Sequence, residues 1–234
     1  MAHPDVLILR PQPGAESSRA RAQALGLDAL VAPIFHIVPL PWDPPAPQDY
    51  RAIVFTSAHA PRQAGPALAA YRALPCFTVG ASTAAAARTA GFADVRTGPS
   101  DAFALAAMMR GEAVGRALHL CGRDHLALDL EGVDRRIVYA ADPLPFLVPE
   151  AIAALRAGTV PLVHSARTAA HFAALVKGAG LDPSTLSLAA ISKAAATAAG
   201  PGWRHVAVPP TPRDQPLLEL AAKLCKEAAS REQR

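Results

Sequence analysis

The sequence predicts an α/β protein with two doubly wound parallel-sheet domains, and three observations lead to this prediction. The 234 residues are 51% hydrophobic but only 5% aromatic, which favours alanine-rich helices packed on sheets over an aromatic-rich β sandwich. Short runs of Val, Ile, Leu and Phe alternate with alanine-rich stretches, as in successive βα units. Three loop motifs of the first half also recur, in the same order, in the second half.

The repeat defines two halves of similar length. In the first motif a strand runs into a loop with Arg or Gly, and in the second a strand ends in serine. In the third a strand enters a loop of small residues before an alanine-rich helix. One short match could arise by chance, but three in register indicate a duplicated fold. The matched pairs, each separated by about 110 residues, are Arg10 and Gly122, Ser57 and Ser165, and Gly80 and Ser192.

The βα units have recognisable boundaries. The first strand ends at Arg10, because the prolines that follow block its continuation. A helix is predicted over 16–25 with Gly26 as its stop, and a second alanine-rich helix closes in the same way on Gly91. The last segment, 214–234, is predicted to begin as a helix packed on the first domain and to fray at its end.

Two stretches break the βα pattern and divide the chain into domains. Residues 31–41 and 136–145 are extended and bounded by prolines, so we expect them to pass between the domains as a pair of linker strands. The first βα unit then belongs with the C-terminal half. Domain one is expected to comprise 1–35 plus 145–234, with domain two, 41–136, inserted into it.

Composition excludes several classes of protein. The net charge of +4 suits an anionic ligand, but the scattered Lys and Arg residues argue against nucleic-acid binding. No apolar run reaches the ~20 residues of a membrane span and no signal peptide is evident, so we expect a cytoplasmic protein, monomeric by default. Wide cysteine spacing and the lack of HExxH predict no metal site. The lack of GxGxxG and GxxxxGK[ST] predicts no nucleotide cofactor.

The repeated loops point to an anion-binding site. Ligands of open α/β sheets bind beyond the carboxyl ends of the strands, where helix N-termini hold carboxylates or phosphates. Ser57, Gly80, Ser165 and Ser192 all stand at such turns. Each one could be only a helix N-cap, worth about 1 kcal/mol. For the whole set, present on two domains, a shared anion-binding cleft is the better interpretation.

Six segments stand in a characteristic order along the chain: VLILRP, IVFTSAHA, VGASTAAAARTAGF, VYAADPLP, VHSARTAAHF and LAAISKAAATAA. Together they resemble the uroporphyrinogen-III synthases over nearly the whole chain. The resemblance implies two α/β domains joined by a two-stranded linker, with the active-site cleft between them. It also implies a cofactor-free lyase that cyclises hydroxymethylbilane, handed over by the upstream deaminase, with inversion of ring D and loss of water.

The resemblance assigns one catalytic residue and a set of substrate-binding residues. Tyr139 matches the family's cleft tyrosine and would hydrogen-bond to the departing hydroxyl and help it leave as water, although a tyrosine packed at a domain junction is the alternative. The loops and the resemblance together predict substrate binding by Arg10, Thr56, Ser57, Gly80, Ser82, Thr83, Gly122, Arg123, Ser165, Ala166, Ser192 and Lys193.

Two departures from the family pattern keep alternatives open. The second copy of the third loop has Ser192 and Ala195 where the family has Gly and Thr, and 124–135 is short for a full helix. The altered loop suggests a catalytically inactive homologue as one alternative to a synthase. The other alternative is a two-domain small-anion binding protein resembling periplasmic solute receptors, which also close α/β halves over a ligand, although the lack of an export signal counts against it.

Overall fold

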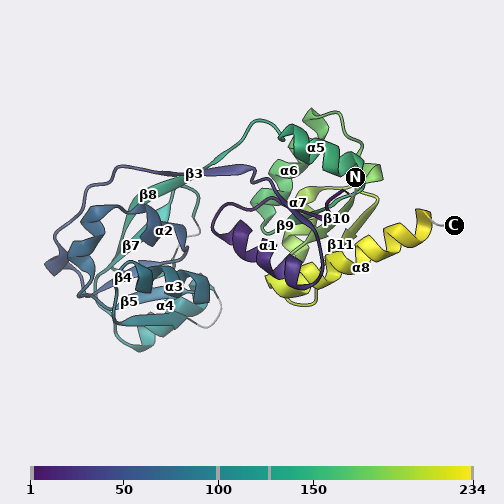
Figure 1. The fold of residues 1–234 in the computed structure, drawn as a ribbon. Coiled ribbons are helices and arrows are strands. Elements are labelled where there is room, and N and C mark those ends of the chain that lie inside the picture. Colours follow the sequence, from purple (N-terminus) through teal and green to yellow (C-terminus); the bar gives the residue numbers. More distant parts are fainter. Residues whose placement is uncertain (1–2, 99–100, 126–127, 233–234) are drawn as a thin grey trace. The chain divides into compact units, whose positions relative to one another are not determined.

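The computed structural model describes residues 3–98, 101–125 and 128–232, and the chain divides into two compact units. Unit 1 comprises residues 1–36 and 143–234, and unit 2 comprises residues 37–142. Each unit is built on one β-sheet with helices packed against it (Figure 1). No helix among the described residues is both long enough and apolar enough to span a membrane.

Unit 1 contains a five-stranded sheet in the order β11-β10-β9-β1-β2. Every neighbouring pair in this sheet is parallel. The strands are β1 (Val6–Ile8), β2 (Ala29–Val31), β9 (Val160–Val163), β10 (Ser187–Ala190) and β11 (His205–Ala207). The helices are α1 (Gly14–Ala24), α5 (Pro149–Arg156), α6 (Ala166–Gly178), α7 (Lys193–Ala199) and α8 (Asp214–Glu232), with a 3-10 turn at Pro183–Thr185.

Unit 2 contains a six-stranded sheet in the order β3-β8-β7-β4-β5-β6. The pairs from β8 to β6 are all parallel. The strands are β3 (Phe35–Pro39), β4 (Ala52–Phe55), β5 (Cys76–Val79), β6 (Val95–Gly98), β7 (Ala117–Gly122) and β8 (Val133–Pro143). The helices are α2 (His59–Gln63), α3 (Ala81–Thr89) and α4 (Ala102–Gly111), with 3-10 turns at Pro47–Asp49 and Pro66–Tyr71.

The two sheets share one strand order, which explains the repeat in the sequence. Reading β11-β10-β9-β1-β2 against β6-β5-β4-β7-β8 pairs β9 with β4, β10 with β5 and β1 with β7. These pairs are the strands that precede the three repeated loop motifs. The predicted fold class, two doubly wound parallel sheets, is therefore confirmed.

Alternating side chains give the sheet of unit 2 a core on each face. Ile53 and Phe55 of β4 pack in one cluster with Tyr71 and Leu118. Ala52 and Val54, on the opposite side of the same strand, pack in a second cluster that covers the other face. Burial on both faces is why β4 is apolar at every position.

The core of unit 1 contains residues from its N-terminal strand and its C-terminal helix. Val6 and Ile8 of β1 pack with Leu217 and Leu218 of α8, so the predicted C-terminal helix packs on this unit. Residues 233–234, at the end predicted to fray, lie outside the described residues. Helix α1 begins at Gly14, two residues before its predicted start.

Strands β3 and β8 are neighbours in the sheet and carry the chain between the units (Figure 1). On the side of unit 1, the Phe35 ring lies 5.1 Å from that of His171, and the His171 Nε2 donates to the Leu144 carbonyl at 2.9 Å. On the side of unit 2, the Leu40 amide donates to the Val138 carbonyl at 2.9 Å. Both linker strands are therefore anchored by side-chain packing and backbone hydrogen bonds.

The connection from β7 to β8 differs from its counterpart in unit 1. In unit 1 the equivalent connection, from β1 to β2, contains α1. In unit 2 the described residues 123–125 and 128–132 form no helix, as their small number predicted. Leu128 instead packs directly into the second core cluster and is 1% exposed. Among the described residues of this connection, Leu128 and the partly buried Leu130 thus pack on the sheet where unit 1 has a helix.

Candidate functional site

Each sheet has one point at which the strand order reverses. In unit 1 the chain proceeds outward from β1 in one direction and from β9 in the other, so the reversal lies between these paired strands. In unit 2 it lies between the paired strands β4 and β7. Open α/β sheets bind their ligands beyond the carboxyl ends of the strands at this point. We call these places the switch points of unit 1 and unit 2.

The structure places all the predicted binding residues at the carboxyl ends of strands. Arg10 follows β1, and Gly122 is the last residue of its counterpart β7. The remaining residues follow β4, β5 and β7 in unit 2, and β9 and β10 in unit 1. In unit 2 these are Thr56 and Ser57 after β4, Arg123 after β7, and Gly80, Ser82 and Thr83 after β5; in unit 1 they are Ser165 and Ala166 after β9, and Ser192 and Lys193 after β10.

Two of the repeated serines, Ser165 and Ser192, cap helices, as the simpler interpretation predicted. Ser165 Oγ accepts a hydrogen bond from the Thr168 amide at 3.0 Å, and Ser192 Oγ accepts one from the Ala195 amide at 3.2 Å. In unit 2, Ser57 Oγ accepts one from the His59 amide at 3.3 Å. A capping serine satisfies one amide of the first helical turn, and the other amides there have no intrahelical partner. Capping and anion binding are therefore compatible at these turns.

The third loop enters a helix in both units, but its first residue differs in side chain and in backbone conformation. Gly80 caps α3 with a φ of 76°, a left-handed conformation that favours glycine, whereas Ser192 caps α7 in an extended conformation. Three residues further on, Thr83 and Ala195 are both buried. Thr83 is 4% exposed and contributes packing in this structure. Its predicted contact with a ligand stays a prediction.

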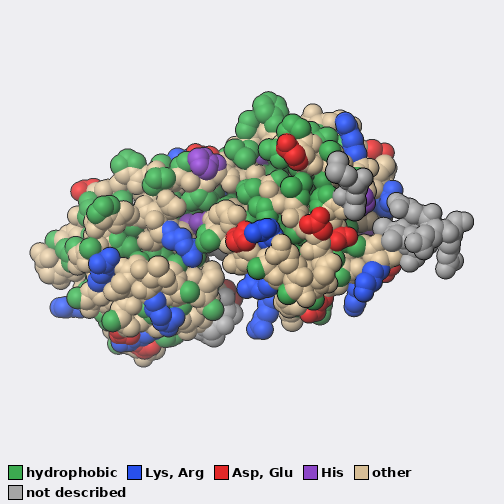
Figure 2. Space-filling model, viewed as in Figure 1, with side chains coloured by type: hydrophobic (Ala, Val, Ile, Leu, Met, Phe, Trp, Pro, Cys, Tyr) green, Lys and Arg blue, Asp and Glu red, His purple; other side chains and the backbone are tan. Residues whose placement is uncertain are grey.

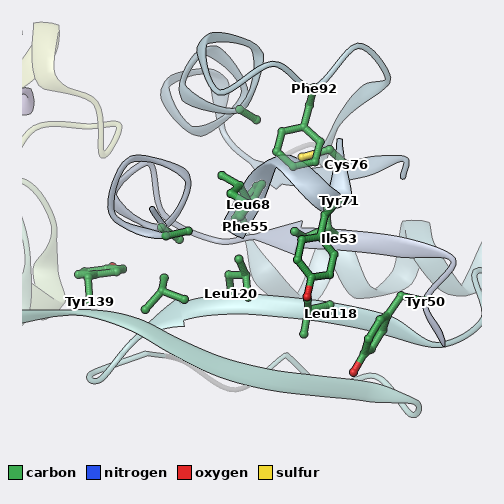
Figure 3. Close-up of a cluster of buried hydrophobic side chains, with 14 residues drawn as sticks. Tyr50, Ile53, Phe55, Leu68, Tyr71, Cys76, Phe92, Leu118, Leu120 and Tyr139 are labelled. Carbon is green, nitrogen blue, oxygen red and sulfur yellow. The ribbon is translucent and has the colours of Figure 1, made fainter. Parts of the chain in front are cut away.

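Tyr139 lies in β8, directly beside the switch point of unit 2. It is 8% exposed and belongs to the core cluster that contains Leu120 and Val138. Figure 3 shows it at one end of the labelled side chains, away from Tyr50 at the other end. Its ring lies 5.5 Å from that of His59, which belongs to α2. The phenol therefore stands where the apolar core meets the loops that follow β4.

Gly122 makes room for the Tyr139 ring. The two residues are register partners, at a point where the pairing of β7 with β8 is irregular. A Cβ atom on Gly122 would lie 2.6 Å from Tyr139 Cζ and 2.8 Å from its hydroxyl oxygen. No side chain larger than hydrogen fits without moving the ring. This requirement explains the glycine at the end of β7.

We predict that Gly122→Ala displaces the Tyr139 ring and lowers turnover of the substrate proposed below by about tenfold. Unfolding in urea should show a loss of about 1 to 3 kcal/mol, the usual cost of overpacking. Gly178→Ala is the matched control, because Gly178 ends α6 with nothing within 4 Å of the added methyl group. Equal activity of the two variants would show that the ring position does not matter.

A buried histidine lies in β7, one of the two strands at the switch point of unit 2. His119 of β7 is 0% exposed, and its Nε2 lies 3.1 Å from Thr56 Oγ1. Its ring lies 6.0 Å from that of His125, at 87°. Burial, followed by the charges of His125 and Arg135, lowers the pKa of His119 to about 4. His119 is therefore neutral at pH 7. Sequence analysis missed it, since one histidine in an apolar strand gives no periodic signal.

A cluster of polar side chains lies at the switch point of unit 1, centred on Asp214 at the start of α8. Its carboxylate accepts hydrogen bonds from His164 Nε2 at 2.7 Å, Ser18 Oγ at 2.8 Å and Arg21 at 2.7 Å. The Arg10 guanidinium lies 3.8 Å away. The predicted ligand residue Arg10 is therefore part of a network that the sequence did not reveal.

The charges of this cluster are set by burial and pairing. Burial alone would raise the pKa of Asp214, but the hydrogen bonds from His164, Ser18 and Arg21 hold it well below its usual range. Burial lowers the pKa of His164, against the hydrogen bond to Asp214. Burial also lowers the pKa of Arg10, although an arginine stays charged at neutral pH. Two arginines thus face one carboxylate, which leaves a positive charge for an anionic ligand.

Two further predicted cations are exposed, at Arg123 and Lys193. Arg123 forms an ion pair with Asp142 at 3.0 Å, so an incoming carboxylate would compete with that partner. On the face drawn in Figure 2, basic side chains are dispersed among acidic ones. The residues described contain no group of three His, Cys, Asp or Glu side chains that could hold a metal ion.

These features define a class of protein: a duplicated α/β protein with hydroxyl groups, helix N-termini and a few cations at equivalent switch points, suited to a ligand with several negative charges. The family model described as uroporphyrinogen-III synthase HemD matches residues 16–219. The chain therefore belongs to the uroporphyrinogen-III synthase family, whose enzymes act in haem biosynthesis. Among curated proteins, no relative matches this chain.

Solved structures share the fold. The uroporphyrinogen-III synthetase of Helicobacter pylori is 14% identical, with a TM-score of 0.62 over 94% of this chain and 99% of that chain. A mutant uroporphyrinogen III synthase of Thermus thermophilus is 17% identical, with a TM-score of 0.50 over 95% of this chain and 99% of that chain. At such identities the likeness supports the fold and not the individual site residues.

Proposed function

We propose that this chain is a uroporphyrinogen-III synthase that cyclises hydroxymethylbilane, with inversion of ring D and loss of water. The observation that carries the proposal is the pair of equivalent switch points, each with a serine at the turn into the following helix and an arginine nearby. Hydroxymethylbilane is a linear tetrapyrrole with eight carboxylates, so it needs many anion contacts spread over a large surface. The family membership supports the same assignment.

The proposed reaction depends mainly on orientation. Loss of the terminal hydroxyl gives an azafulvene, which attacks the substituted carbon of ring D to form a spiro intermediate. This intermediate opens and recloses with ring D inverted. Closure without inversion needs no enzyme and gives the symmetric isomer I. The chain must therefore hold the substrate so that the spiro route is the nearer one, a use of binding energy for orientation.

The loops of both units share this task in the proposal. Arg10, close to its partner Asp214, and the start of α6 provide a positive charge and backbone amides in unit 1. Thr56, Ser57 and Ser82 provide hydroxyl groups in unit 2. Contacts of this kind hold acetate and propionate groups without covalent chemistry.

Tyr139 is the proposed catalytic residue. A phenol is protonated at neutral pH, so it can donate a hydrogen bond to the departing hydroxyl and help it leave as water. Its position between Gly122 and His59, at the edge of the core, holds the ring in one orientation. The proposed enzyme is a cofactor-free lyase that works as a cytoplasmic monomer and receives its substrate from the upstream deaminase.

The product isomers test the proposal. Hydroxymethylbilane is generated from porphobilinogen by a deaminase, the chain is added, and the products are oxidised and separated by chromatography. We expect isomer III to dominate at a rate well above spontaneous closure. Isomer I alone, at the spontaneous rate, would refute the synthase.

The altered third loop of unit 1 keeps a second candidate open. Ala195 provides no hydroxyl where unit 2 has Thr83, which would suit a small-anion binding protein or an inactive homologue. Such a protein would form no isomer III, and its anion binding would survive Tyr139→Phe.

A further inference from the structure

The pair formed by Thr56 and His119 is unusual for the interior of a parallel sheet. Side chains alternate along a strand, so His119 shares a face of β7 with Ala117, which packs in the same core cluster as Val54 and Leu128. A histidine that is 0% exposed on such a face loses its hydration on folding. Thr56 Oγ1, at 3.1 Å, is its hydrogen-bond partner. Buried polar groups of this kind call for an explanation.

The proton of the His119 ring can be assigned from its partners. A neutral imidazole has one N–H donor and one acceptor nitrogen. Nδ1 has no hydrogen-bond partner among the residues that the structure describes. An unpaired buried N–H is rarer than an unpaired buried acceptor, so the proton belongs on Nε2. His119 then donates to Thr56 Oγ1, and Thr56 accepts.

This assignment determines what the Thr56 hydroxyl can do. One of the two lone pairs of its oxygen accepts the bond from His119, so the hydroxyl proton is directed away from the ring. Thr56 directly follows β4, is half-buried, and stands at the switch point of unit 2. Because the hydroxyl oxygen accepts from the buried His119, the hydroxyl proton can be donated to a ligand at the switch point. Carboxylates are acceptors only, so they are the matching ligand class.

We propose that His119 is a positioning residue, which holds the Thr56 hydroxyl as a hydrogen-bond donor to a carboxylate of the substrate. The inference rests on the proposed function for the identity of that substrate. His119 touches no substrate and acts through Thr56. The pKa of His119, lowered to about 4 by burial, keeps the ring neutral at the pH of the reaction and supports the single-donor assignment.

Four variants test the inference by kinetics with hydroxymethylbilane. Thr56→Val removes the hydroxyl and keeps the shape, and should raise KM by about tenfold, the value of one hydrogen bond to a charged group. His119→Leu should raise KM by about three- to fivefold with kcat nearly unchanged, because the hydroxyl loses its orientation. The double variant should match Thr56→Val alone, since His119 has no effect without the hydroxyl.

His119→Gln is the conservative variant, since a glutamine amide can place its donor near the position of Nε2. It should restore KM to within about twofold of the unsubstituted chain, which a purely structural role of the ring would not predict. His205→Gln, exposed at the start of β11, is the matched control and should leave KM and kcat unchanged. Additive effects of His119→Leu and Thr56→Val, or an unchanged KM in soluble, folded His119→Leu, would overturn the inference.

Nitrogen NMR of the whole chain provides a readout that does not depend on activity or on a leucine variant that folds. We expect the His119 ring to be protonated on Nε2, with a resonance that shifts in Thr56→Val. Protonation on Nδ1 would make Thr56 the donor to His119 and would overturn the inference. If the unsubstituted chain forms no isomer III, the proposed function fails, and the NMR result still decides the inferred hydrogen bond.

Discussion

Tyr139→Phe is expected to lower turnover of hydroxymethylbilane by one to two orders of magnitude, with little loss of stability. The substitution removes only the hydroxyl, so the ring still fills the space above Gly122 and beside His59. The lost contribution is that of one general acid, which is typically about 10²-fold or more. Stopped assays of isomer III formation at saturating substrate measure it, and urea unfolding measures stability.

Tyr50→Phe is the matched control. Tyr50 belongs to the same core cluster, is 2% exposed, and donates from its hydroxyl to Asp134 at 2.8 Å. Loss of this hydroxyl should therefore lower the free energy of unfolding by about 1 to 3 kcal/mol, because its partner is charged. Turnover should stay unchanged. Turnover of Tyr139→Phe equal to that of Tyr50→Phe would exclude the acid role and leave Tyr139 as a packing residue.

The repeated loops could be predicted because they obey local rules. Strand ends, capping serines and helix-stopping glycines each have a signature within a few residues, so Ser165 and Ser192 were found at the correct turns. The three motifs in register predicted a duplicated fold, and the two sheets share one strand order. The assignment of the first βα unit to the C-terminal half depended on a different signal, the two proline-bounded stretches 31–41 and 136–145 that interrupt the βα pattern.

The supporting residues of the site could not be predicted because they depend on distant parts of the chain. Asp214 and its partner Ser18 are 196 positions apart, and His119 and Thr56 are 63 apart. No spacing rule connects such residues before the sheet order is known. His164 and Asp214, which are hydrogen-bonded at 2.7 Å, are likewise 50 positions apart.

The structure also separates residues that the sequence had grouped. Thr83 and Ser82 were both predicted to bind substrate, but only Ser82 is exposed. The reason is helical periodicity, because the third residue of α3 turns toward the sheet while the second faces away. Likewise Arg123 is paired with Asp142, a partner that sequence analysis did not consider. Burial and pairing, both consequences of tertiary structure, decide which loop residues are available.

Asp214→Ala is expected to give the largest loss of stability, about 3 kcal/mol in the free energy of unfolding. The side chain is 13% exposed and receives hydrogen bonds from His164, Ser18 and Arg21. Its removal leaves buried donors unpaired and two arginines facing each other without a carboxylate. Urea unfolding at pH 7 measures the loss. Glu219→Ala, which removes an exposed acid from the same helix, should change stability by about 0.5 kcal/mol or less.

The pH dependence of this loss distinguishes the charge of Asp214 from its packing. The pKa of Asp214 is lower in the folded chain than its ordinary value of 3.8. Its charge therefore stabilises the fold fully above about pH 4, and this contribution is lost as the pH falls below that value. The difference between the unsubstituted chain and Asp214→Ala should thus shrink as the pH falls below about pH 4. A difference that stays constant down to pH 2 would show that Asp214 acts through packing alone, without a stabilising charge.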